Sequence, residues 1–127
     1  MADDWLRMTA AEMGRAIGAG EIDARELTEA HLSAAEAHPD AARVYVRLTP
    51  ERARAEADAA AERARLGVRR GPLDGVPISW KDLYDSAGDV TGAGSAMFAD
   101  RAPAEADCPP LARATAEGMV CLGKTHM

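Results

Sequence analysis

The chain has 127 residues, and its 15 basic and 21 acidic side chains give it a formal net charge of −6. This acidic balance argues against direct binding to a nucleic-acid backbone, and no apolar run approaches the roughly 18 residues of a membrane-spanning helix. Cys108 and Cys121 lack the spacing of a metal site or of a disulfide framework. We therefore expect no membrane partner, no metal, no other cofactor and no direct nucleic-acid partner. An acidic start in place of a basic leader favours a cytoplasmic location.

The apolar residues of this chain are mostly small. Alanine accounts for 29 of the 60 hydrophobic residues, whereas Ile, Leu, Val and Phe together number 19. So low a content of large apolar residues, under roughly 20%, is usually typical of disorder, but the net charge is modest and the helical patterning is regular. We therefore predict helices with small-residue faces, in a layer that packs on further structure.

Two helices are predicted in an arm of about residues 1–40. Thr9 and Glu12 have the spacing of a capping box, in which a hydroxyl and a carboxylate satisfy the free N–H groups of the first helical turn. Asp23 and Glu26 repeat this spacing, and the second helix is expected to run to about Ala37.

The rest of the chain, about residues 44–127, alternates strands with helices. We predict strands at 44–48, 76–80 and 119–122, a helix at about 50–66 and another from Asp107 or Pro110 to Gly118, with an ordered surface loop at 85–106. Thr49 is expected to cap the helix that starts at Pro50. A strand, helix and strand with a short crossover predict a parallel pair joined in the right-handed sense, and thus an α/β fold.

Lys81 is the most informative residue because it directly follows the apolar strand at 76–80. Ligands of open α/β sheets bind at the carboxyl ends of strands. Burial there would lower the pKa of a lysine and allow it to act as a general base. The alternative is a lysine that reaches water and pairs with Asp82.

Three segments resemble the amidase signature family. Residues 71–82 read GPLDGVPISWKD and are similar to the segment that carries the family's catalytic lysine. Residues 91–95, TGAGS, resemble its Gly-Ser loop, and residues 118–127, GMVCLGKTHM, resemble its GKTNM strand. The sequence departs from the family pattern at His126, where asparagine is commoner, and at Trp80, where an aliphatic residue is usual. We expect Trp80 to pack against small residues such as those of the alanine-rich helix.

The resemblance implies a layered α/β/α fold on a mixed sheet, of which residues 1–127 form the N-terminal part of a single domain with about three strands. It also implies hydrolysis of carboxamides, without a cofactor, by two serines and a lysine. Only the lysine maps onto this chain, as Lys81, since the family's serines lie in a Gly/Ser-rich stretch that follows the GKTNM strand. The chain alone is therefore predicted to be inactive. A C-terminal amidase half would complete the sheet and a small-molecule amide would be the substrate.

Two alternatives stay open. The chain resembles equally the glutamine-hydrolysing subunit of a glutamyl/aspartyl-tRNA amidotransferase, a branch of the same family, or it is a non-catalytic truncated fragment or interaction piece. Other constellations are weak. Ser79 is expected to be a packing serine, Cys121 and His126 should point to opposite faces of a strand, and His31 and His38 lack the partners of a metal site.

Overall fold

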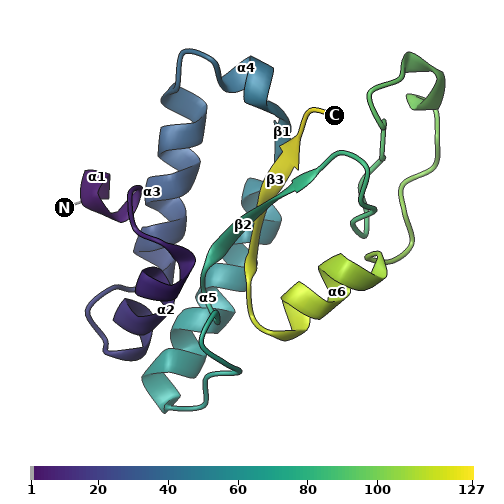
Figure 1. Ribbon diagram of the computed structural model, residues 1–127. Coiled ribbons are helices and arrows are strands. Elements are labelled where there is room, and N and C mark those ends of the chain that lie inside the picture. Colours follow the sequence, from purple (N-terminus) through teal and green to yellow (C-terminus); the bar gives the residue numbers. More distant parts are fainter. Residues whose placement is uncertain (1) are drawn as a thin grey trace.

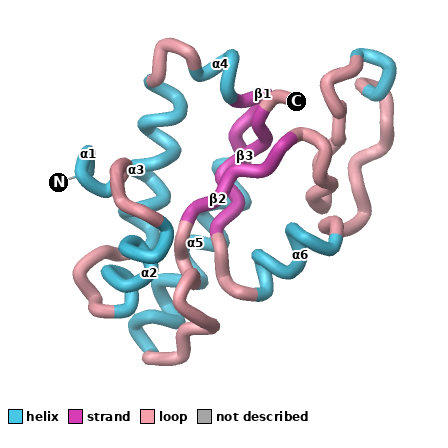
Figure 2. Tube along the Cα trace, viewed as in Figure 1, coloured by secondary structure: helices cyan, strands magenta, loops and turns pink. Residues whose placement is uncertain are grey.

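The computed structural model describes residues 2–127 and has a mixed α/β architecture (Figure 1). The elements in chain order are α1 (Ala2–Trp5), α2 (Ala10–Gly18), α3 (Ala24–Ala37), α4 (Ala41–Val44), β1 (Tyr45–Leu48), α5 (Pro50–Leu66), β2 (Pro77–Lys81), the 3₁₀ helix η1 (Ala96–Phe98), α6 (Pro109–Ala116) and β3 (Val120–Thr125). Helices α1–α3 lie on one side of the strands, whereas α6 and a long loop lie on the other (Figure 2). None of the helices within residues 2–127 combines the length and apolar character needed to span a bilayer.

The three strands form one sheet in the order β1-β3-β2. β2 and β3 are parallel, with Pro77 opposite Val120 and Lys81 opposite Thr125, whereas β1 runs antiparallel to β3. The predicted parallel pair and the α/β class are thereby confirmed. β1 and β2 are the two edges, so each offers an open row of backbone groups.

The two predicted N-terminal helices are present. The Thr9 hydroxyl accepts the Glu12 N–H at 3.2 Å and the Glu12 carboxylate accepts the Thr9 N–H at 2.7 Å, which confirms the capping box. Asp23 begins α3, but its carboxylate accepts the N–H of Arg25 at 2.7 Å and also pairs with the Arg25 guanidinium. α3 ends at Ala37 as predicted.

Helix α5 provides the small-residue face that the composition predicts. Its alanines at 53, 57, 60 and 61 are buried. Two of them pack with Leu32, Val120 and Leu122, and the other two pack in a second cluster with residues of α2 and α3. Because alanine has no long side chain, α5 can approach both α3 and β3 closely.

Three local predictions are wrong in detail. Val44 closes the one-turn helix α4, and the strand begins one residue later at Tyr45. Thr49 makes no side-chain cap on α5, because its hydroxyl donates to the Cys121 carbonyl of β3 at 3.0 Å. The ring of Trp80 packs edge-on against Tyr84, with ring centres 5.5 Å apart, while the alanine face of α5 contacts α3 and β3.

Candidate functional site

Lys81 lies at the carboxyl end of β2, where the backbone leaves the sheet. The next residue remains tied to β3, because the Asp82 N–H donates to the Thr125 carbonyl at 2.8 Å. The Lys81 carbonyl accepts the N–H groups of Leu83 at 2.6 Å and Tyr84 at 3.1 Å, which closes a tight turn. The backbone that presents Lys81 is therefore held from both sides.

The side chain of Lys81 is exposed, contrary to the expected burial. β2 is an edge strand, and no other part of residues 2–127 covers its carboxyl end closely enough to exclude water. Lys81 forms no ion pair with any residue that the structure describes, so the expected alternative of a pair with Asp82 is also wrong.

Asp82 is buried and pairs instead with Arg47 of β1. One Asp82 oxygen accepts from Arg47 Nη2 at 2.9 Å and the other accepts the Gly92 N–H at 3.3 Å. The Asp82 carbonyl accepts the N–H of Ala93 at 3.0 Å. Asp82 thereby joins the lysine segment to the TGAGS segment that follows it in the sequence.

Arg47 holds a second carboxylate of the same loop. Its Nε and Nη2 donate to Asp89 at 2.8–2.9 Å, and Nη2 also donates to the Val90 carbonyl at 2.8 Å. Burial alone would raise the pKa of Asp89, but the hydrogen bonds from Arg47 outweigh it and the pKa lies below its ordinary value. Sequence reasoning missed Arg47, although a cation within the otherwise apolar run at 44–48 is an available signal.

Lys124 is the buried lysine of this chain. Its side chain is fully inaccessible to solvent, and Nζ donates to the backbone carbonyl of Tyr84. The chain contains only two lysines, so the structure divides them completely: Lys81 is exposed at a sheet edge and Lys124 is enclosed beneath the loop that follows Lys81.

Arg52 of α5 secures the far end of the same loop. Its Nη1 and Nη2 donate to the two Asp107 oxygens at 2.7 and 2.8 Å, and Asp107 also accepts the Ala87 N–H at 2.8 Å. The Arg52 hydrogen bonds lower the pKa of Asp107. Cations from β1, β3 and α5 thus hold the segment between Lys81 and α6.

The remaining candidates have structural partners. The hydroxyls of Ser79 and Tyr45 are hydrogen-bonded at 2.6 Å. His126 Nε2 lies 2.9 Å from the Ala42 carbonyl, whereas the Cys121 thiol lies against the Thr49 hydroxyl, so the two do not form a catalytic pair. Burial raises the pKa of Cys121.

Neither histidine of the N-terminal arm takes part in a site. His31 Nδ1 lies 2.9 Å from the Leu27 carbonyl, and His38 Nδ1 accepts the Asp40 N–H at 3.1 Å. Within residues 2–127, no group of three or more His, Cys, Asp or Glu side chains is arranged to hold a metal ion.

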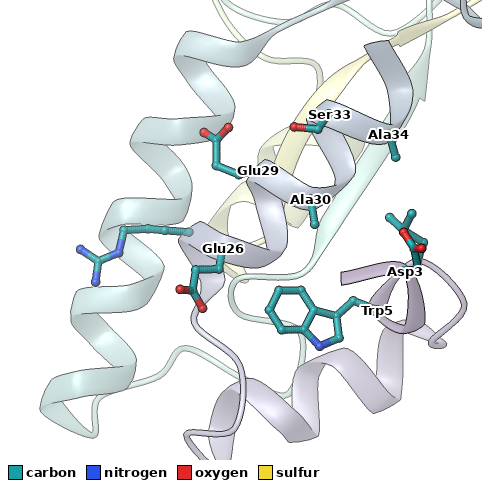
Figure 3. Close-up of a pocket in the computed structure, with 9 residues that line it drawn as sticks. Asp3, Trp5, Glu26, Glu29, Ala30, Ser33 and Ala34 are labelled. Atoms are coloured by element: carbon teal, nitrogen blue, oxygen red, sulfur yellow. The ribbon is translucent and has the colours of Figure 1, made fainter. Parts of the chain in front are cut away.

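The largest hollow is remote from Lys81. It is an open groove of about 890 Å³ between α1 and the outward face of α3, with Trp5, Ala30 and Ala34 on its walls and Glu26 and Glu29 at its rim (Figure 3). No segment that resembles a catalytic motif lies on it, so we place the candidate site at the carboxyl end of β2.

One family explains this arrangement of segments. The sequence model of the Amidase family matches residues 26–127, which include both motif segments that meet at Asp82 and the β3 strand. The chain belongs to the amidase family. Its family relatives include a component of the glutamyl-tRNA(Gln) amidotransferase of Streptomyces coelicolor, which is 36% identical over 124 residues.

Solved amidase-family structures share the fold. A chain from a vestigial protein complex that bears on the origins of an s-triazine catabolic enzyme superposes with a TM-score of 0.86 at 36% identity, over 93% of this chain and 26% of that one. The peptide amidase of Stenotrophomonas maltophilia gives 0.82 at 34% identity, over 93% and 24%. The alignment with the Streptomyces relative covers 98% of this chain but 25% of the relative, so the chain spans about a quarter of its relatives' length.

Proposed function

We propose that this chain provides the lysine-bearing part of a carboxamide hydrolase and that Lys81 is its general base. What supports the proposal is the place of Lys81: it is an accessible amine at the carboxyl end of a parallel strand, on a backbone held by β3. The motif that resembles the family's lysine segment ends at this residue and its neighbour.

The chemistry needs a neutral amine. Lys81 would accept a proton from a serine hydroxyl, and a second serine, relayed through the first, would attack the carbonyl carbon of the amide. Backbone N–H groups would stabilise the oxyanion that forms on the carbonyl oxygen. Both serines belong, by resemblance, to the part of the relatives that this chain does not cover.

The test is a completed enzyme, in which residues 1–127 are joined to the remaining three quarters of a family relative such as the peptide amidase. Lys81→Ala should lower kcat by at least about 100-fold, the low end for a general base. Lys81→Arg should be equally inactive, because a guanidinium stays protonated. Arg54→Gln, which removes an exposed ion pair with Glu29, is the matched control and should keep full turnover. Retention of turnover by Lys81→Ala would refute the proposal and favour a non-catalytic role.

The isolated chain should release no ammonia or amine from any primary amide, because the serine nucleophile is not among its candidate residues. A panel of amides, assayed beside Lys81→Ala, measures this directly. Release above that of the variant would mean that another group within residues 1–127 acts as nucleophile.

A second candidate is the glutamine-hydrolysing component of a tRNA-dependent amidotransferase. The specific support is the amidotransferase relative from Streptomyces coelicolor, which aligns with nearly the whole chain. In the completed enzyme, glutaminase activity that depends on the other amidotransferase components would favour this function. Hydrolysis of simple amides without any partner would favour a free-standing amidase.

A further inference from the structure

A lysine followed closely by acidic residues ordinarily finds a counter-ion. Lys81 has three carboxylates within the next eight positions, namely Asp82, Asp85 and Asp89. An ammonium paired with a carboxylate holds its proton more tightly, so any of these pairs would oppose general-base chemistry.

The structure directs all three carboxylates away from Lys81. Asp82 and Asp89 accept hydrogen bonds from Arg47, and Asp85 accepts the hydroxyl of Thr91 at 2.6 Å. Arg47 is the one side chain of the described residues that engages two of the three.

The pairing between Arg47 and Asp82 is shielded from water. The Asp82 side chain is 3% exposed and the Arg47 side chain 29% exposed, and the donor and acceptor are 2.9 Å apart. Shielded pairs interact more strongly than exposed ones. The planar guanidinium also reaches the Val90 carbonyl with a further N–H, which a lysine at this position could not do simultaneously.

We propose that Arg47 is a positioning residue for Lys81: by taking the carboxylates of Asp82 and Asp89, it leaves the Lys81 amine without a counter-ion. This inference gains its functional meaning from the proposed role of Lys81 as a base. The arrangement lets a lysine and an aspartate be sequence neighbours without forming the ion pair that their proximity favours.

Lys81 offers a direct measurement of this, since only two lysines exist and the other is buried. The 127-residue chain is treated with the N-hydroxysuccinimide ester of acetic acid, which reacts with neutral amines, and the acetylation rate of Lys81 is read by peptide mass spectrometry. Arg47→Met should slow this rate at least about twofold, the effect of one uncompensated charge roughly 8 Å away in water.

Rescue separates the charge effect from a loosened loop. Arg47→Met combined with Asp82→Asn should recover most of the rate lost in Arg47→Met, whereas a loop that is only loosened would not recover. Arg47→Lys should lie between wild type and Arg47→Met. Arg54→Gln, at an exposed pair on α5, should leave the rate unchanged.

Two results would overturn the inference. One is an unchanged Lys81 rate in Arg47→Met with the far-UV circular dichroism of the parent. The other is a several-fold faster rate in Asp82→Asn alone, since that would make Asp82 the counter-ion of Lys81; this variant decides the matter even if Arg47→Met does not fold. Because the assay measures a free amine and no hydrolysis, failure of the proposed function would leave its outcome untouched.

Discussion

Replacing the buried lysine should destabilise the chain far more than replacing the exposed one. Lys124 is fully enclosed and donates to the Tyr84 carbonyl, whereas Lys81 projects into solvent without an ion pair among residues 2–127. The two substitutions therefore separate structural from chemical roles within one chain.

The magnitude for Lys124→Ala has three parts. Deleting a large buried side chain costs about 2–5 kcal/mol, and leaving the Tyr84 carbonyl unpaired costs about 1–3 kcal/mol. Removing a buried charge returns several kcal/mol of desolvation free energy. We expect a net loss of about 2–4 kcal/mol in the free energy of unfolding. Lys81→Ala should change it by no more than about 0.5 kcal/mol.

Urea unfolding, followed by far-UV circular dichroism and by the fluorescence of Trp5 and Trp80, measures both variants. Lys124→Met is the matched control for packing, because it keeps the length of the stem and removes only the ammonium. Acetylation of the native chain gives an independent check, since Lys81 should react and Lys124 should react only on unfolding. Equal urea midpoints for the two alanine variants, or equal acetylation of the two lysines in the native chain, would refute this assignment of burial.

Further predictions concern stability, pH and thiol reactivity. With open sheet edges and an alanine-rich core, the isolated chain should unfold with less than about 5 kcal/mol or aggregate; a monomer with a cooperative transition and greater stability would contradict this. Arginine hydrogen bonds lower the pKa of Asp107, and they also lower that of Asp74 against the opposing effect of burial. These groups therefore contribute stability that is present above their unfolded pKa of about 3.9 and is lost as pH falls through the folded values. The melting temperature should accordingly drop below about pH 4, and a melting temperature that stays constant as the pH falls through this range would count against it. Thr9→Ala should cost about 1 kcal/mol through loss of the α2 cap, measured by urea unfolding. In mildly alkaline buffer, iodoacetamide should modify the partly exposed Cys108 well before the buried Cys121, and equal rates would be inconsistent with the structure.

Local signals in the sequence determined most of the secondary structure. The cap at Thr9, the αL glycine at Gly67 and the proline at the start of α5 act within about one helical turn, so their effects are readable without the fold. The parallel arrangement of β2 and β3 also follows from the sequence, because the short crossover leaves little other choice. The same reasoning placed Lys81 at a strand end.

Only the tertiary structure decided the environment of that strand end. Arg47 and Asp82 are 35 positions apart, and Lys124 and Tyr84 are 40 apart, so no local pattern reports their pairing. Thr49 likewise prefers a carbonyl 72 residues away over the cap that its own helix offers. A charged side chain is buried or exposed according to the partners that distant segments bring to it. This is why the sequence could identify two lysines, while the fold alone determined which one is enclosed and which one is free.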